Sequence, residues 1–357
     1  MKRLAFVGLL SVATIILAAF FPLFNAEACT RMFWNTNGQV MLVARNMDLD
    51  VDDQPIIYVF PKGISRDGGA DVNPATWISQ YGSVVVTHWG ASTGSFEGIN
   101  TAGLGFHALY LGPTQYENRD SRPGVLQGRY GEYLLDNAAT VSDALQLMYQ
   151  TQLVPQLASG KVMPQHFALE DASGDSAVIE FIGGQMNVYH GTGYTVLTND
   201  PPFDQQISNL PRYQYFGGGL PLPGDIDPTS RFVRASAFLS TLKAAFSNPA
   251  IKTDAISALF TAIRSLMQPF GAVFFSGDTP VTGWPTLWTA LSDLTNKAFY
   301  FTHNLARNNF WIDMRKLDFQ EGAPIQSLKA DRPDLAGEVS SLFTSPSPAI
   351  PSLLLSD

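Results

Sequence analysis

The amino-acid sequence predicts an α+β layered fold. Segments with the composition of β-strands form hairpin pairs near both ends of the chain, and helical patterns group between them. This order differs from the regular βαβ alternation that builds a parallel sheet. The chain has 357 residues, of which 45% are hydrophobic, so it can bury a sizeable core.

The first 28 residues have the features of a secretory signal peptide. A basic start at Met1–Arg3 precedes an almost unbroken apolar stretch from Leu4 to Phe24. Ala26–Ala28 then forms an A-x-A cleavage signal directly before Cys29. We therefore expect residues 1–28 to be removed and the protein to be exported.

The predicted strands begin with a hairpin close to the new N-terminus. Asn37–Gly38 supplies the turn between Arg31–Trp34 and Val40–Ala44, which are both rich in β-forming residues. Further strands are predicted, in chain order, at Ser83–His88, Leu104–Leu111, Gln165–Asp171, Ser176–Phe181, Val188–Leu197, Leu287–Ser292, Ala298–Thr302 and Phe310–Met314.

Helical patterns lie between these strands. Thr140 and Asp143 form a capping box at the start of a first apolar stripe. A second stripe, from Phe232 to Phe246, follows Thr229 or Ser230 as the expected cap. A third stripe consists of Ile256, Leu259, Phe260, Ile263, Leu266 and Met267, at helical spacing.

We expect one domain, over residues 29–335. Residues 336–357 are expected to form a poorly ordered tail, because Pro346, Pro348 and Pro351 interrupt regular structure there. After the signal peptide, no apolar run approaches the roughly 20 residues that a membrane span needs. The net charge of −9 and the lack of basic runs make nucleic acid an unsuitable partner.

Cys29 is the only cysteine of the chain, so it cannot form an intramolecular disulfide. Cleavage before it would place a thiol and a free α-amine on one residue, which pairs a nucleophile with its own general base. Two other interpretations remain open: a small buried hydrophobic residue, and a lipoprotein that is acylated and anchored at Cys29. The charged Glu27 and the lack of a leucine at position 26 fit a lipoprotein site poorly.

A second nucleophile candidate is Ser92, in the G-x-S-x-G pattern of Gly90–Gly94. That motif needs a helix directly after the serine, and the segment that follows lacks a helical pattern. The five histidines are scattered without metal-ligand spacing on one helix. The sequence also lacks the glycine-rich motifs that bind phosphates or dinucleotides.

Three polar segments stand out besides Cys29. Arg45 and Asp48 end the first hairpin and so return near the start of the mature chain. Asn199 lies where a strand stops, and its amide can donate to an oxyanion. Arg231 falls in the first turn of the second helix, with Arg234 three residues later. Each of these alone is equally consistent with turns, caps and surface ion pairs.

Together these segments resemble the choloylglycine hydrolase and penicillin V acylase family of N-terminal-nucleophile hydrolases. The matching residues occur in family order: Cys29–Arg31, Arg45–Asp48, Asn100–Gly105 with Tyr110, Leu197–Asn199, and Leu222–Asp225 with Ser230–Phe232. The resemblance implies a four-layer αββα sandwich of two antiparallel sheets.

The resemblance also implies a role for each site residue. Cys29 would be the nucleophile, with its α-amine as the base and Asp48 holding that amine. Arg45 and Arg231 would lie beside the thiol. Asn199 and the backbone N–H of Tyr110 would form the oxyanion hole. The enzyme would cleave a linear amide through a thioester acyl-enzyme, with no metal or organic cofactor.

The resemblance narrows the substrate, compartment and assembly. Tyr110 and the signal peptide are similar to the exported Gram-negative branch, which implies a periplasmic homotetramer that cleaves penicillin V or N-acyl homoserine lactones. Conjugated bile salts are the alternative substrate. Leu49 replaces an aromatic residue of some relatives, and Tyr110 could instead be an ordinary core aromatic.

Overall fold

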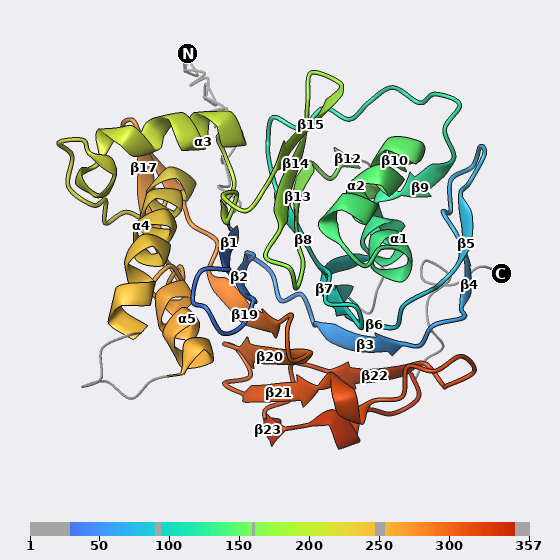
Figure 1. Cartoon of the computed structure of the whole chain (residues 1–357). Helices are drawn as coiled ribbons and strands as arrows, with labels where there is room; N and C mark the ends of the chain where they lie inside the picture. Colours follow the sequence, from blue (N-terminus) through green and yellow to red (C-terminus); the bar gives the residue numbers. More distant parts are fainter. Residues whose placement is uncertain (1–28, 90–93, 159–160, 247–253, 347–357) are drawn as a thin grey trace, which may run out of the picture.

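Two large sheets face each other at the centre of the computed structural model, and helices cover their outer surfaces (Figure 1). The structure describes residues 29–89, 94–158, 161–246 and 254–346. Both sheets are antiparallel apart from one parallel pair at the edge of the first. The predicted αββα sandwich is therefore confirmed.

The first sheet contains the first and the last strand of the described chain. Its strands lie in the order β16, β1, β2, β19, β20, β21 and β23. Their bounds are Val196–Leu197, Cys29–Trp34, Leu42–Asp48, Thr286–Asp293, Ala298–His303, Asn309–Asp313 and Ala336–Glu338, respectively. Every residue of β1, β2 and β19 is buried, because this sheet is covered on both faces.

The second sheet is built from the middle of the chain. Its strands lie in the order β15, β14, β13, β8, β7, β6, β3 and β22. Their bounds are Gln185–His190, Ser176–Ile182, Gln165–Glu170, Gly105–Tyr110, Ser95–Asn100, Ser83–Thr87, Ile56–Phe60 and Gln326–Lys329. The sequence analysis missed β3, β7 and β22.

The remaining strands form four small two-stranded pairs. They are β4 (Ser65–Asp67) with β5 (Thr76–Ile78), β9 (Gly124–Leu126) with β10 (Gln152–Val154), β11 (Leu157–Ala158) with β12 (Lys161–Val162), and β17 (Val273–Ser276) with β18 (Thr279–Thr282).

The helices form the outer layers. On one side, α4 (Pro228–Phe246) and α5 (Ala255–Arg264) pack on the first sheet, and on the other α1 (Tyr130–Asn137) packs on the second, beside α2 (Val141–Gln150) (Figure 1). A short α3 (Phe203–Asn209) precedes α4. No helix in the described ranges is long and apolar enough to cross a membrane.

Helix starts follow the local sequence. The capping box of Thr140 and Asp143 is confirmed, with both reciprocal hydrogen bonds present. The predicted cap of α4 was wrong: the helix begins at Pro228, and the Asp227 carboxylate accepts from the Ser230 N–H. Proline suits this first helical position because its missing N–H has no intrahelical partner there. Helix α1 was not predicted.

The single strand predicted at Val188–Leu197 was also wrong. The chain leaves the second sheet after His190 and enters the first sheet as β16, which pairs with β1. Gly191 allows this change of sheet, because its φ of 136° lies where other residues are strained. The crossing delivers Asn199 to the neighbourhood of Cys29.

Regular structure continues after residue 335 in the described part of the chain. Strand β23 pairs with β21, and Thr344 pairs with Ser327 of β22. Residues 347–357 of the predicted tail and residues 1–28, the predicted signal peptide, lie outside the described residues.

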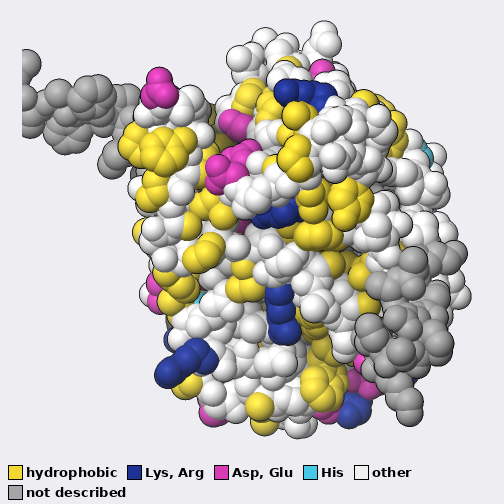
Figure 2. Space-filling view, turned by 90° about the vertical axis from the view of Figure 1, so that its left-hand side faces the viewer, with side chains coloured by type: hydrophobic (Ala, Val, Ile, Leu, Met, Phe, Trp, Pro, Cys, Tyr) yellow, Lys and Arg dark blue, Asp and Glu magenta, His cyan; other side chains and the backbone are white. Residues whose placement is uncertain are grey.

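The face that carries α4 and α5 is shown in Figure 2. Over the described part of this face, lysine and arginine side chains are scattered singly among apolar, acidic and other polar groups (Figure 2).

Candidate active site

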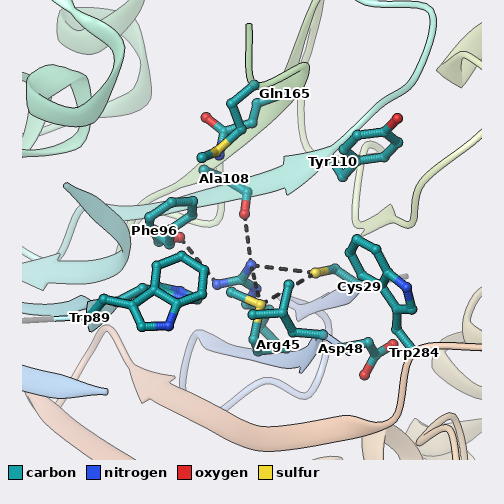
Figure 3. Close-up of a pocket in the computed structure, with 13 residues that line it drawn as sticks. Cys29, Arg45, Asp48, Trp89, Phe96, Ala108, Tyr110, Gln165 and Trp284 are labelled. Carbon is teal, nitrogen blue, oxygen red and sulfur yellow. Dashed lines mark hydrogen bonds between the residues drawn. The ribbon is translucent and has the colours of Figure 1, made fainter. Parts of the chain in front are cut away.

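Cys29 is the first residue of β1 and lines a pocket between the two sheets. Only 5% of the residue is exposed. The pocket contains about 580 Å³ of empty space, part of it open to solvent. Its walls are mainly apolar and include Leu49 and Met163. Trp89, Phe96 and Trp284 also line it (Figure 3).

The β1–β2 hairpin places Arg45 beside the thiol. Cys29 is opposite Met47 in the register, and Arg45 lies two residues from Met47, on the same face. The Arg45 Nη2 donates to Cys29 Sγ at 3.5 Å and to the Ala108 carbonyl at 2.7 Å (Figure 3). Its Nη1 donates to the Phe96 carbonyl at 3.2 Å. The carbonyls thus hold the guanidinium against the sulfur.

Burial and neighbouring groups have opposite effects on the pKa of the Cys29 thiol. Burial raises the pKa of Cys29 above its ordinary value, because the thiolate is poorly solvated there. The positive charge of Arg45 opposes this increase, and the backbone N–H of Asp48 also favours the thiolate. Nucleophilicity of Cys29 therefore depends on Arg45 and on a base that takes its proton.

Asn199 and Arg231 contact the backbone of Cys29. The Cys29 N–H donates to Asn199 Oδ1 at 2.5 Å, and this oxygen also accepts from Arg231 Nη2 at 3.1 Å. Arg231 Nη1 donates to the Cys29 carbonyl at 2.6 Å and to Thr30 Oγ1. Two residues about 170 and 200 positions away thus fix the start of β1.

Asp48 is buried at the end of β2. Its carboxylate accepts from Thr286 Oγ1 and from Gln268 Nε2 at 3.2 Å, and it lies 3.9 Å from Arg231 Nη1. The predicted contact between Asp48 and the α-amine of Cys29 concerns the cleaved chain and remains a prediction. In the full chain that nitrogen is a peptide nitrogen with one hydrogen, and Asn199 accepts it.

Tyr110 lines the pocket at the end of β8, as expected for a residue beside the acyl group. Its carbonyl accepts from Asn199 Nδ2 at 2.9 Å. An asparagine amide nitrogen carries two hydrogens, so this bond leaves the second for another acceptor. The oxyanion roles predicted for Asn199 and the Tyr110 N–H remain predictions.

A buried row of charges that the sequence analysis missed continues from Arg45. His107 Nδ1 is 2.6 Å from Glu97 Oε2, and His107 Nε2 is 2.5 Å from Glu170 Oε1. Arg31 pairs with the other oxygen of Glu170. These residues are within 1% of complete burial. Cross-strand pairing of Glu97 with His107 is the signal that could have revealed them, once β7 was known.

A second buried group, also missed, surrounds Asp53. Its carboxylate accepts from Trp288 Nε1 at 2.7 Å and lies 3.1 Å from His88 Nδ1. Burial lowers the pKa of His88 to about 4, so its ring is neutral at pH 7. His88 lines the pocket, where it packs against Phe96 with ring centroids 4.2 Å apart.

Asp52, Asp53 and His303 are close enough to suggest a metal site within the described residues. However, His303 Nδ1 accepts from the Ala306 N–H at 3.1 Å. A neutral His303 therefore carries its proton on Nε2, the nitrogen that faces Asp53. A metal ligand instead needs its free lone pair on that side, so this tautomer does not suit a metal.

The competing serine, Ser92, lies outside the described residues. The chain resumes at Gly94 and forms strand β7 from Ser95. A nucleophile elbow requires a helix at this point. The described segment therefore does not have the geometry of a serine-hydrolase motif.

The raised pKa of Asp48 predicts that the free energy of unfolding depends on pH. Burial raises its pKa from 3.8 to about 6, although Arg231 opposes this. A raised folded-state pKa means that the stability contribution is full below pH 3.8 and is lost as pH rises through 6. From pH 3.5 to 7, the free energy of unfolding should fall by about 3 kcal/mol relative to Asp48→Asn. Urea denaturation of protein that retains the residues before Cys29 measures this. If wild type and Asp48→Asn differ in unfolding free energy by the same amount at both pH values, the prediction is contradicted.

Comparisons with known proteins identify the family of the chain. The family model of linear amide C–N hydrolases, choloylglycine hydrolase family, matches residues 29–329. A penicillin V acylase of Pectobacterium atrosepticum is 31% identical over 313 residues, which are 82% of this chain and 82% of that protein. A bile salt hydrolase/transferase of Clostridium perfringens is 24% identical over 238 residues, 59% of this chain and 71% of that protein.

Solved structures give the same result. Penicillin V acylase from Agrobacterium tumefaciens superposes with a TM-score of 0.77 at 33% identity and covers 90% of this chain and 98% of its own. A variant of the conjugated bile acid hydrolase from Clostridium perfringens has a TM-score of 0.70 at 21% identity, covering 84% and 97%. The second match supports the fold alone.

Proposed function

Because the chain belongs to the choloylglycine hydrolase family of linear amide C–N hydrolases, we propose that it cleaves its amide substrate with the N-terminal cysteine left by removal of residues 1–28. The observation that carries this proposal is the position of Cys29. Its sulfur lies in an apolar pocket against Arg45, and its nitrogen lies on the same residue, next to Asn199.

The first step is activation of the thiol. An α-amine has a reference pKa of about 7.7–8.0, so it can accept the thiol proton near neutral pH. The Arg45 guanidinium, 3.5 Å from the sulfur, stabilises the thiolate that forms. Cleavage also adds N–H groups to the Cys29 nitrogen. One of them can donate a hydrogen bond to the Asp48 carboxylate, while the existing N–H continues to donate to Asn199 Oδ1.

The thiolate then attacks the amide carbonyl. The second hydrogen of Asn199 Nδ2 and the Tyr110 N–H stabilise the oxyanion, and the protonated α-amine gives its proton to the leaving nitrogen. A thioester between Cys29 and the acyl group remains. Water, activated by the same amine, hydrolyses it and restores the thiol.

The proposed oxyanion role of Asn199 predicts that its replacement lowers the rate of hydrolysis. Asn199→Ala should lower kcat by roughly 10²–10³-fold, the usual cost of losing one oxyanion donor. KM should change far less, because the interaction strengthens only in the transition state. Steady-state kinetics measure both; an unchanged kcat with a raised KM would make Asn199 a substrate-positioning residue instead. Asn209→Ala, at the half-buried C-terminal end of α3 and outside the pocket lining, provides the matched control.

The apolar pocket favours aryl or alkyl acyl groups. Trp89, Phe96 and Trp284 offer flat surfaces for an aromatic or extended chain, and Leu49 widens the wall where some relatives carry an aromatic residue. We therefore favour phenoxyacetyl amides such as penicillin V, or N-acyl homoserine lactones, as substrates. Conjugated bile salts are the alternative, on the likeness to bile salt hydrolases.

Substrate choice predicts an order of rates. Wild type should have a higher kcat/KM for penicillin V and a long-chain N-acyl homoserine lactone than for glycocholate. Tyr110→Asn should shift the ratio toward glycocholate by opening space beside the carbonyl. Hydrolysis of the three compounds by both proteins tests this. A wild-type preference for glycocholate, or an unchanged ranking in the variant, would contradict the assignment.

Compartment and assembly are part of the same proposal. Export to the periplasm follows from the A-x-A signal that directly precedes β1. Intact mass of periplasmic protein should begin at an unmodified Cys29; a diacylglyceryl addition would indicate the lipoprotein alternative. The homotetramer implied by the family resemblance can be tested by light scattering during size-exclusion chromatography.

A further inference from the structure

The buried row of Glu97, His107 and Glu170 lies directly behind Arg45, and two cations compete there for one oxygen. Glu97 Oε2 is 2.6 Å from His107 Nδ1 and 3.6 Å from Arg45 Nη1. The imidazole therefore has the closer contact. The guanidinium stays about one ångström further away and directs its Nη2 to the Ala108 carbonyl and Cys29 Sγ.

The surroundings of His107 favour its protonated form, which can bind the Glu97 carboxylate. Both ring nitrogens face carboxylates, Glu97 on one side and Glu170 on the other, so a charged ring donates to both. The two carboxylates overcome the effect of burial and raise the pKa of His107 to about 9. Opposite charges likewise keep the pKa of Glu170 at about 2, although burial acts against this.

The backbone is adapted to this arrangement. Gly105 lies opposite Glu170 in the register of β8 and β13. A Cβ at position 105 would be 2.1 Å from Glu170 Oε1, the oxygen that reaches His107. The absence of a side chain there lets Glu170 approach the imidazole diagonally across the sheet.

The cations of the row outnumber its anions by one. Three cations, Arg31, His107 and Arg45, face two anions, Glu97 and Glu170. Of the other charged groups beside the pocket, Asp48 and Arg231 face each other at 3.9 Å. His88 is neutral, and the Asp53 carboxylate on its far side accepts a hydrogen bond from Trp288 Nε1. Hence the surplus positive charge is that of Arg45, the group in contact with Cys29 Sγ.

We infer that His107 is a positioning residue for the proposed reaction: it occupies the Glu97 carboxylate, so that the Arg45 guanidinium remains against the Cys29 thiol. The inference rests on the proposed role of Cys29 as nucleophile. Without the imidazolium, Glu97 attracts Arg45 away from the sulfur, and the interior also loses one positive charge. Both effects disfavour the thiolate.

The test measures the thiol directly. The rate of Cys29 alkylation by iodoacetamide as a function of pH gives its pKa without any substrate, and the reading is unambiguous because the chain has one cysteine. In mature His107→Gln, this pKa should rise by about one unit or more. The acid limb of kcat/KM for penicillin V should shift in parallel, by roughly tenfold in rate at pH 7.

A double variant separates positioning from simple structural support. If His107 acts by occupying Glu97, then adding Glu97→Gln removes the group that captures Arg45, and His107→Gln/Glu97→Gln should return the thiol pKa toward wild type. A structural role alone would make the double variant worse than either single one. His166→Gln is the matched control, because His166 is equally buried in the same sheet and pairs with Glu180 instead of the row.

The control should lose stability without moving the thiol pKa. An unchanged thiol pKa in folded His107→Gln, or a double variant shifted further than His107→Gln, would overturn the inference. The proposed function fails separately. If the thiol pKa shifts in His107→Gln but wild type hydrolyses none of the amides, the function is refuted and the effect of His107 on the Cys29 thiol stands.

Discussion

Cys29→Ala should abolish amide hydrolysis while the chain remains folded. The thiol forms the covalent bond to the acyl group, so its loss should lower kcat/KM for penicillin V by roughly 10⁴-fold or more. The fold should persist because alanine removes only the sulfur, which contacts the side chains of Met47 and Arg45. Turnover and the thermal unfolding midpoint of the purified variant measure the two parts of this prediction.

Ser92→Ala is the natural control for that experiment. Ser92 is the nucleophile of the competing interpretation, and it is followed in the described chain by a strand rather than a helix. We expect its rate to stay near that of wild type. An inactive Ser92→Ala beside an active Cys29→Ala would establish the serine as nucleophile and overturn the proposed mechanism.

The second large effect should come from blocking the nitrogen of Cys29. When that nitrogen stays in a peptide bond, its lone pair is delocalised and cannot accept the thiol proton. Loss of the base should lower the rate by roughly 10²–10⁴-fold. The comparison is between protein carrying an uncleavable extension before Cys29 and the same chain after proteolytic release of Cys29, with both N-termini verified by mass.

The same protein before and after release acts as its own control for folding. Cys29 N donates to Asn199 Oδ1 in the full chain, so the strand is already in place before cleavage. Activity should therefore appear on release without refolding. Full activity of the blocked form would show that the α-amine is not the base.

Local sequence was sufficient for much of the fold. The hairpin of β1 and β2 follows from a turn at Asn37–Gly38 between two β-rich segments, and the α2 start follows from its capping box. The same hairpin carries Cys29, Arg45 and Asp48, so their proximity is a consequence of short-range pairing. These contacts are accessible to sequence analysis because each depends on residues close together in the chain.

Other elements were missed where both faces of a strand are buried. Strand β7 contains Glu97 and is buried throughout, so it lacks the alternation of apolar and polar residues that marks a half-exposed strand. The predicted strand at Val188–Leu197 failed for a related reason. Composition cannot show that the chain changes sheets at Gly191, because the new pairing is with β1, about 160 residues earlier.

The sequence by itself determined the α+β class, and it predicts a cleavage signal and the candidate residues Cys29, Arg45, Asp48, Tyr110, Asn199 and Arg231. Only the tertiary structure decided how they meet. Asn199 and Arg231 reach the Cys29 backbone through a sheet crossing and a distant helix, and His107 separates Glu97 from Arg45 inside the sandwich. The physical reason is that burial makes paired charges necessary, but which charges pair depends on sheet packing between segments far apart in the chain.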